Sequence, residues 1–440
     1  MHRLLFTILL SGSLALPMTA VASEQDKPLS EVLSASEGKS LTSKLEKYLG
    51  AGVDSKDLVG MRDKFEKEVN KLESKHKVGL LRDIEYLGGL FTLASTHSHE
   101  RPKSKGRAKE YTKTELIAGN KLEASYTLFV PKGYRGDKPW PIIIGLHPAG
   151  KDGNWYMEEV LDDPALRESY IILCPTIAEG ESWTERAGII KMIGLSLNEV
   201  ATKHFVDKDR MFLDGFADSG NAALKLASSF EDLFAGVVSR SGGLDGVPVE
   251  TNMSYVGAFC AVGTDDQALK LDDLRKQVDG LAQKKIPITL KEMAGAGQST
   301  FTELNGEIAA WLAERKRQLF PQTVSISTEH PMFGRAFWVA VLRTETGIDP
   351  ETKAPFVATL QASYDRGENR IDITSKNVYK IEVFLNDTIV DMDRPITIRV
   401  NGEEKWQGIK ERDWRYLIDR YRSSGDPTRL FTASIDIDIR

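Results

Sequence analysis

Three short stretches of the sequence carry side chains suited to nucleophilic or acid–base chemistry, and each follows an apolar run. Ser219 follows the run that ends at Phe216, the carboxylates Asp265 and Asp266 follow residues 255–262, and Gln298 follows residues 287–293. A serine becomes a nucleophile when a histidine takes its proton and an acid orients that histidine. The seven histidines are residues 2, 76, 97, 99, 147, 204 and 330, and His330 alone follows the last of these runs.

The residues between these stretches predict the elements that must position them. Short continuous apolar runs alternate with helical stretches, which is typical of parallel strands buried on both faces. The predicted strands are Leu122–Val130, Ile142–His147, Ile171–Cys174, Met211–Phe216, Ala235–Ser239, Tyr255–Val262 and Pro287–Met293, and a helix over Gly306–Arg315 closes the unit. This pattern predicts one α/β domain over residues 114–320, with a mostly parallel sheet and helices on both faces.

Four motifs in chain order give this domain its resemblance to the α/β-hydrolase superfamily, in particular to secreted bacterial esterase- and peptidase-like members. They are His147-Pro148-Ala149-Gly150 at the oxyanion loop, Ala217-Asp218-Ser219-Gly220 at the nucleophile elbow, Gly263-Thr264-Asp265-Asp266 at the acid and Gly295-Ala296-Gly297-Gln298 at the base. The order nucleophile, acid, base is that of the superfamily. The resemblance implies a hydrolase scaffold over roughly residues 115–318.

The catalytic positions that the resemblance assigns depart from the superfamily pattern. In G-x-S-x-G register the nucleophile position is Ala217 and the base position is Gln298, which cannot accept and return a proton at neutral pH. The acid is retained as Asp266, with Asp265 as the less favoured choice. Asp218 places a carboxylate beside the N–H that would stabilise an oxyanion, which opposes that charge. A register shifted by two residues would make Ser219 the nucleophile, still without an identified base.

These departures leave three hypotheses about function and leave enzyme status undecided. The first is a degenerate hydrolase, a pseudoenzyme that binds a small molecule, peptide or envelope protein through the former cleft, with His147, Trp183 and Asp218 as pocket residues. The second is an active esterase or peptidase that uses Ser219 in a rearranged site. The third is a structural or adhesive envelope protein. No cofactor is expected, and His97-Ser98-His99-Glu100 and Asp391-Met392-Asp393 lack the further ligands of a metal site.

The sequence on either side of this domain predicts two further parts. Apolar residues at helical spacing, from Leu58 to Leu72 and from Val78 to Phe91, predict a helical pair in residues 23–113 that ends in a basic, solvated linker over 101–113. Residues 321–440 predict a small antiparallel, sandwich-like β domain interrupted by a helix over Arg412–Arg422. Residues 101–113 and Phe320–His330 are expected to be the most protease-sensitive stretches, because they lack apolar periodicity.

The N-terminus and the composition bear on the compartment and on partners. A basic head, an apolar run from Leu4 to Leu16 and Ala20-Val21-Ala22 predict a signal peptide over residues 1–22, cleaved after Ala22, and a secreted or periplasmic protein without stable membrane insertion. The chain of 440 residues has 58 basic and 64 acidic residues and a formal net charge of −6, which argues against nucleic-acid binding.

The two cysteines of the chain are expected to be free despite an oxidising compartment. Cys174 and Cys260 fall on predicted strands that the superfamily's strand order places four spacings apart. At about 4.8 Å per spacing, that separation far exceeds the Cα limit of about 7 Å for a disulfide.

Overall fold

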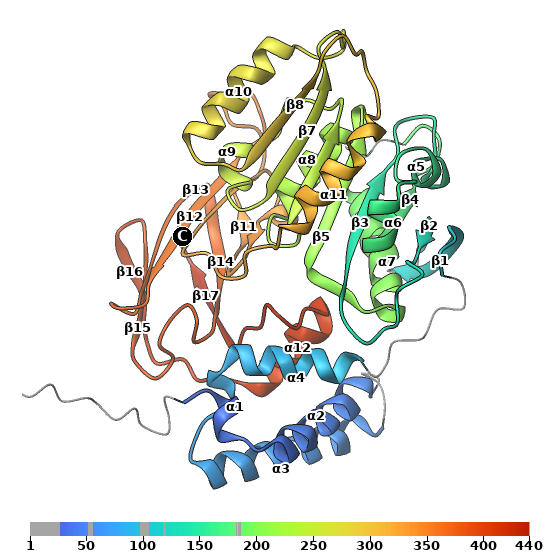
Figure 1. Ribbon diagram of the computed structural model, residues 1–440. Helices are drawn as coiled ribbons and strands as arrows, with labels where there is room; N and C mark the ends of the chain where they lie inside the picture. The colour runs from blue at the N-terminus through green and yellow to red at the C-terminus, as the bar shows by residue number, and fades with distance from the viewer. Residues whose placement is uncertain are drawn as a thin grey trace, which may run out of the picture.

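The computed structural model describes residues 27–51, 56–96, 105–117, 120–181, 183 and 186–439. Within these ranges the chain forms an N-terminal helical layer, a central α/β unit and a C-terminal β sandwich (Figure 1). The predicted signal peptide and the stretch His97–Glu100 lie outside the described residues.

The central unit is built on an eight-stranded sheet in the order β1-β2-β4-β3-β5-β6-β7-β8. The antiparallel part comprises β1 (Lys109–Ile117) and β2 (Asn120–Phe129), with β2 antiparallel to β4. The strands from β4 onward are parallel: β4 (Ile171–Thr176), β3 (Trp140–Leu146), β5 (Val206–Phe216), β6 (Gly236–Arg240), β7 (Gly257–Gly263) and β8 (Ile288–Met293). This order and direction define the α/β-hydrolase fold, so the predicted fold class is confirmed.

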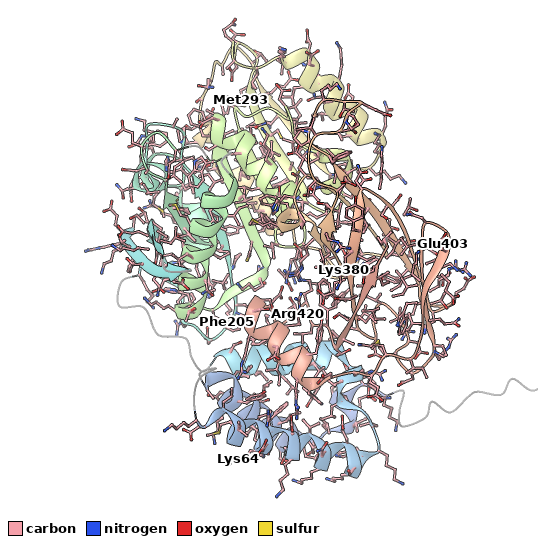
Figure 2. The ribbon with its side chains drawn as sticks, turned by 180° about the vertical axis from the view of Figure 1, so that it is seen from behind. Lys64, Phe205, Met293, Lys380, Glu403 and Arg420 are labelled. Atoms are coloured by element: carbon pink, nitrogen blue, oxygen red, sulfur yellow. The ribbon has the colours of Figure 1, made fainter. Side chains whose placement is uncertain are left out.

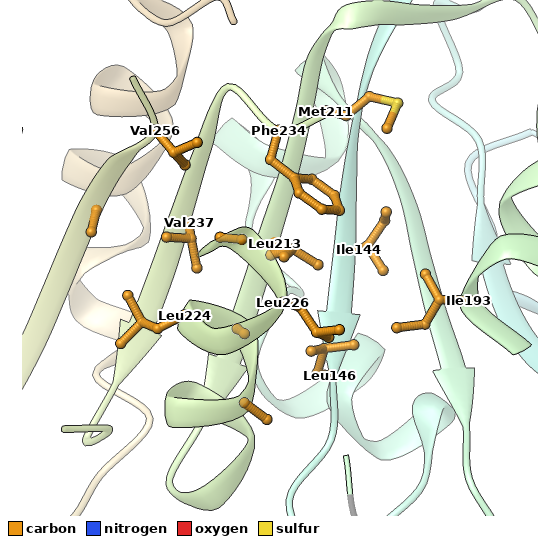
Figure 3. Packing of buried hydrophobic residues seen from close by; sticks show 14 of the residues in the cluster. Ile144, Leu146, Ile193, Met211, Leu213, Leu224, Leu226, Phe234, Val237 and Val256 are labelled. Atoms are coloured by element: carbon orange, nitrogen blue, oxygen red, sulfur yellow. The ribbon is translucent and has the colours of Figure 1, made fainter. Parts of the chain in front are cut away.

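Helices cover both faces of this sheet, as the apolar runs predicted. They are α5 (Gly153–Glu159), α6 (Pro164–Ser169), α7 (Arg186–Lys203), α8 (Asp218–Ser229), α9 (Val249–Asn252), α10 (Leu271–Gln283) and α11 (Asn305–Ala313). On one face, Leu224 and Leu226 of α8 pack over Leu146, Leu213 and other strand residues (Figure 3). On the other face, α5, α6 and α11 bury a second cluster that includes Phe212 and Phe259. Burial on both faces keeps the strand ends, and the loops that follow them, in fixed positions.

The N-terminal layer contains more helices than the predicted pair and includes one from the other end of the chain. Its helices are α1 (Leu29–Val32), α2 (Ala35–Gly50), α3 (Leu58–His76) and α4 (Ile84–Thr96), with a 3₁₀ turn over Leu80–Arg82. The C-terminal helix α12 (Trp414–Ser424) lies against them (Figure 1). The rings of Phe65 and Trp414 lie 5.1 Å apart, and those of Phe91 and Tyr421 lie 4.6 Å apart. The apolar faces of these helices are therefore completed by a distant segment.

The C-terminal part is a sandwich of two sheets. One sheet has the order β10-β11-β14-β17 and the other β16-β15-β13-β12-β9. Their bounds are β9 (Thr323–Thr328), β10 (Arg335–Ala336), β11 (Val339–Thr344), β12 (Ala358–Asp365), β13 (Arg370–Lys376), β14 (Val378–Leu385), β15 (Ile396–Val400), β16 (Glu403–Gly408) and β17 (Ala433–Asp438). Residues from both sheets share one apolar cluster. The sandwich prediction is thus correct, except that β13 and β15 pair in parallel.

Two stretches predicted to be irregular form strands instead. The predicted basic linker contains the start of β1, which pairs with β2 from Lys109 to Ile117. The stretch Phe320–His330 contains β9, in which buried Val324 and Ile326 alternate with less buried residues and which pairs with β12. Main-chain pairing protects both strands, so preferential proteolysis is no longer expected within 109–113 or 323–328.

The cysteine prediction is confirmed. Cys174 on β4 and Cys260 on β7 are both free and buried, and β3, β5 and β6 separate their strands. Burial raises the pKa of Cys260 to about 12 and raises that of Cys174 as well, so both are unreactive thiols. Within the described ranges, no helix is long and apolar enough to cross a membrane, and no group of three or more metal-binding side chains was found.

Candidate functional site

The turn from β5 into α8 has the backbone geometry of a nucleophile elbow. Ala217, at the junction, has φ 56° and ψ −120°, a conformation that L-residues rarely adopt. Its N–H donates to the carbonyl oxygen of Arg240 on the neighbouring strand at 2.8 Å. A Cβ on Gly215 would lie 2.2 Å from the carbonyl oxygen of Ser219, so the strand and the helix can meet this closely only with glycine there. The elbow is therefore formed, with a methyl group at its tip.

Ser219, the alternative nucleophile, is the second residue of α8, and its side chain points into the protein interior. Its side chain is fully buried. The hydroxyl oxygen lies 2.7 Å from the carbonyl oxygens of both Leu146 and Phe216 and accepts a hydrogen bond from the Phe216 N–H at 3.0 Å. A hydroxyl held in this way braces the elbow and is not presented to a substrate. The geometry thus argues against Ser219 as the nucleophile.

The carboxylate of Asp218 turns toward the loop that offers oxyanion donors in this fold. Asp218 is exposed, and its Oδ1 accepts a hydrogen bond from the Ala149 N–H at 3.4 Å. Asp218 is also the first residue of α8, where the helix dipole favours negative charge. An internal carboxylate therefore lies at a donor that a hydrolase would offer to the developing charge of its substrate.

His147 and Trp183 support this loop from beneath and line no open surface. Each is only 2% exposed. The Ile177 N–H donates to Nε2 of His147 at 3.2 Å, so Nδ1 carries the proton that is donated to the Pro148 carbonyl oxygen at 2.9 Å. The Trp183 indole N–H donates to the His147 carbonyl oxygen at 2.6 Å. Burial lowers the pKa of His147, which keeps the ring neutral. The two residues that were predicted to line a pocket are thus buried, and their hydrogen bonds support the loop that begins at His147.

The acid position is occupied by a nearly buried carboxylate that lacks a full set of partners. Asp266, which follows β7, is 6% exposed, and its Oδ1 accepts from the Ala268 N–H at 2.9 Å. Its Oδ2 is buried and has no hydrogen-bond partner among the described residues. Buried carboxylate oxygens are normally hydrogen-bonded. Asp266 therefore keeps one carboxylate oxygen unpartnered in the loop after β7. The less favoured choice, Asp265, is exposed.

The base position lies on a loop that main-chain contacts hold beside the acid. Gln298 is exposed. Two residues earlier in this loop, the Ala296 carbonyl oxygen accepts from the Asp265 N–H at 2.9 Å. The next residue, Ser299, exchanges hydrogen bonds with the Ser241 hydroxyl at 3.0 and 3.1 Å. The loops of Asp266 and Gln298 are thus tied together and to the end of β6, whose Arg240 holds the elbow. No described hydrogen bond joins the side chains of Asp266 and Gln298.

Beneath the elbow lies a buried ionic group that the sequence analysis did not identify. The Arg240 guanidinium donates to both carboxylate oxygens of Asp214 at 2.9 Å and to the Thr300 carbonyl oxygen at 2.8 Å. The Tyr156 hydroxyl donates to Asp214 at 2.6 Å, and Asn305 accepts from Arg240 at 2.8 Å. The sequence does contain a signal for this group: an aspartate and an arginine each stand within an otherwise apolar strand, and the two strands are adjacent. This group connects the elbow strand with the loop that carries Gln298.

Comparison with known proteins gives matches only among solved structures. No protein-family model and no curated protein matches the sequence. A thermostable esterase matches with 20% identity over 47% of this chain and a TM-score of 0.42, and a ferulic acid esterase with 16% identity over 47% and a TM-score of 0.41. An S-formylglutathione hydrolase from Staphylococcus aureus matches with 14% identity over 48% and a TM-score of 0.39. The chain spans 63% of the thermostable esterase, 98% of the ferulic acid esterase and all of the formylglutathione hydrolase.

Proposed function

We propose that this chain is a catalytically inactive member of the hydrolase scaffold that acts by binding a ligand or partner at the former active-site cleft. The observation that carries the proposal is the strained elbow at Ala217, which presents a methyl group where the fold presents its nucleophile. A methyl group cannot form an acyl intermediate.

The size of the catalytic loss supports inactivity. Removing the serine or the histidine of such a triad lowers kcat by about 10⁶-fold. Residual catalysis of about 10³–10⁴ over water can remain from binding and the oxyanion donors. In this chain the Asp218 carboxylate lies at one of those donors, which opposes even the residual contribution.

Retention of the site's backbone supports a binding role. Unfavourable backbone conformations such as that of Ala217 cost about 1–3 kcal/mol and cluster at functional sites. Beside this elbow, Asp218, Asp265 and Gln298 remain exposed at the carboxyl ends of neighbouring strands, where open α/β sheets bind ligands. These polar groups suit a polar small molecule, a peptide or a protein of the cell envelope. The envelope location follows from the predicted signal peptide.

Two measurements test the proposal. Labelling of the folded protein with a fluorophosphonate probe, together with hydrolysis of a small activated ester, should give no signal above a heat-denatured control, because no activated serine is present. Labelling that Ser219→Ala abolishes would contradict inactivity.

Photo-crosslinking tests the binding part. A photoreactive residue at 298, in cells that produce the protein, should yield an adduct that the same residue at position 64 does not. Lys64 lies in the helical layer, far from Met293 at the end of β8 (Figure 2). Absence of an adduct from position 298, or an identical adduct from position 64, would contradict binding at the cleft.

Burial of His147, Trp183 and Asp266 favours a second candidate, a structural or adhesive envelope protein. If these buried residues leave no accessible cleft, the hydrolase-like unit serves as a scaffold, and the helical and β parts carry the function. In that case Asp218→Arg should leave the cellular phenotype of the wild type intact, whereas a cleft-binding protein should lose its partner.

A further inference from the structure

Outside the former active site, a lysine ammonium lines a small cavity. The cavity has a volume of about 190 Å³ and lies where three parts of the chain meet. Its walls come from α4 (Ser95), α7 (Asn198 and Thr202), the start of β5 (Lys208) and the end of α12 (Ser424). Phe205, which directly precedes β5, and Tyr421 of α12 also line the cavity, at the level where the central unit meets the helical layer (Figure 2).

The ammonium of Lys208 makes no short ion pair within the described residues, although the Asp426 carboxylate attracts it from a longer distance. The side chain is half-buried, and neither a hydrogen bond nor an ion pair to its Nζ was found in the described structure. Burial and the Arg317 guanidinium lower the pKa of Lys208, although Asp426 acts in the opposite direction. The environment is therefore unfavourable to an ammonium unless a further anion is present.

The charged groups near the cavity already form ion pairs with one another. Three guanidiniums and three carboxylates form a connected set of ion pairs, which comprises Arg317, Arg335, Arg429, Asp209, Asp232 and Asp426. Arg317 contacts Asp426 at 2.7 Å and Asp209 at 3.0 Å. Asp209 and Asp426 are therefore already paired with a guanidinium, and the Lys208 ammonium adds a positive charge beside a set of six charges that balances without it.

We propose that this cavity is a binding site for a small inorganic oxyanion, phosphate or sulfate. Lys208 supplies the charge, and the Asn198 amide and the Ser424 hydroxyl supply neutral donors from two other elements. Charge-assisted hydrogen bonds of this kind are the strong ones. The Ser424 hydroxyl is 3.5 Å from the Tyr421 carbonyl oxygen, a weak contact that it can exchange for an anion.

Occupation of this site would join the three parts of the molecule. Lys208 belongs to the central sheet, and Ser424 is the last residue of α12, which packs in the N-terminal helical layer. An anion that contacts both holds the C-terminal helix to the sheet. We therefore expect the melting temperature to rise with anion concentration, because a ligand that binds only the folded state stabilises it.

The experiment uses the full mature chain and titrates inorganic phosphate, then sulfate, against sodium chloride at matched ionic strength. The melting temperature of the wild type should rise saturably with phosphate or sulfate and not with chloride. Isothermal titration should give a Kd that Lys208→Gln weakens by about 10- to 100-fold, the effect of losing one charged hydrogen-bond partner. Lys208→Arg should retain binding, and Lys64→Gln on α3 should match the wild type.

Three outcomes would overturn the proposal. They are a chloride effect equal to that of phosphate, full binding by Lys208→Gln, and loss of binding by Lys64→Gln to the same extent. Circular dichroism of Lys208→Gln establishes that the variant is folded. If that variant does not fold, Ser424→Ala serves in its place, and unchanged phosphate affinity in Ser424→Ala would then count against the site.

Discussion

At the scale of single residues, the elbow shows that backbone geometry and chemical competence are separable. Ala217 keeps φ 56° because Gly215 allows β5 and α8 to approach and because Arg240 accepts its N–H. None of these contacts involves the side chain of residue 217. The fold therefore maintains the turn whether residue 217 carries a hydroxyl or a methyl group.

Restoring both missing triad members should restore activity far more than restoring either one. Ala217→Ser alone lacks a base, and Gln298→His alone lacks a nucleophile. The double variant should hydrolyse a small activated ester well above either single variant, with a strongly non-additive gain, because triad members act as a unit. An imidazole at 298 would also offer an N–H to the unpartnered Oδ2 of Asp266. Initial rates of the four proteins measure this.

The matched control for this rescue is Asp266→Asn in the double variant. If the Asp266 carboxylate orients the new imidazole, this third change should remove most of the gain. Asp218→Met should increase the gain, because it removes the carboxylate from the Ala149 N–H. Additive single effects, or ester hydrolysis by the wild type at ordinary enzyme rates, would disprove the assignment of positions 217 and 298.

The strain at the elbow should be measurable as stability. Ala217→Gly should raise the free energy of unfolding by about 0.5–2 kcal/mol, since glycine adopts positive φ without the strain of about 1–3 kcal/mol but loses about 0.5–1 kcal/mol in backbone entropy. Urea denaturation compares it with Ala223→Gly in the interior of α8, which should destabilise by about 1 kcal/mol or more. A destabilised Ala217→Gly would mean that the methyl group packs usefully.

At the scale of elements, β5 and β6 are joined by a buried ion pair as well as by the backbone hydrogen bonds between the two strands. Asp214 and Arg240 are at most 1% exposed, and the pair extends through Asn305 to α11. Such a pair adds little net stability over apolar residues, but leaving one partner alone is costly. Its effect here is to hold the elbow strand and the loop after β8 in one arrangement.

Arg240→Leu should therefore lower the free energy of unfolding by about 3–5 kcal/mol, because it leaves the Asp214 carboxylate buried without a counter-ion. Arg275→Leu is the control, since Arg275 contacts Glu292 with the same bidentate geometry at the surface. That variant should change stability by about 1 kcal/mol or less. Equal effects of the two variants in chemical denaturation would contradict a special role for the buried pair.

At the scale of the whole molecule, charged residues hold the segment after α12 against the central unit. Arg317, after α11, contacts Asp426 and Thr428 of this segment, and Arg429 contacts Asp232 in the turn after α8. Through this segment the sandwich, the helical layer and the central unit are joined. The pH dependence of the protein's stability, at low and at high pH, should therefore be set in part by the carboxyl groups at this junction.

Low pH should weaken the junction through Asp426. Arg317 and Arg429 hold the pKa of this buried carboxyl well below its usual value, against the effect of burial. A depressed folded-state pKa gives stability that is present above the unfolded value of about 3.9 and lost as pH falls below it. Asp426→Asn should thus be less stable than the wild type at pH 7 and should flatten the acid limb of the melting curve between about pH 4 and pH 2. Asp279→Asn, on exposed α10, should leave that limb unchanged.

Glu231 should have the opposite effect. Its side chain is 3% exposed, its Oε2 has no described partner, and burial together with Asp232 raises its pKa well above the usual value. Stability is therefore greatest below the unfolded pKa of about 4.3 and falls as pH rises through the folded pKa. Glu231→Gln should raise the melting temperature at pH 7 and leave it almost unchanged at pH 4. Destabilisation of Glu231→Gln at pH 7 would contradict the raised pKa, because it would mean that the Glu231 carboxylate stabilises the fold.

Local sequence determined the strands, the fold class and the four loops of the former active site. Continuous apolar runs predicted β3, β4, β6, β7 and the end of β5, whose side chains are buried on both faces of the sheet. The absence of a serine at position 217 and of a histidine at position 298 is likewise read from the sequence, since it concerns residue identity alone. The approximate bounds of the sandwich strands followed from alternation of apolar and polar residues.

Tertiary structure alone decided what depends on partners distant in sequence. β1 was predicted as a linker because its residues are mostly charged or polar, but pairing with β2 stabilises it as a strand. The helical layer needed α12, about 330 residues further along the chain than α4, to complete its apolar faces. His147 and Trp183 became supports of the oxyanion loop, and Asp218 accepted the Ala149 N–H, because hydrogen-bond partners are set by spatial and not by sequential neighbours.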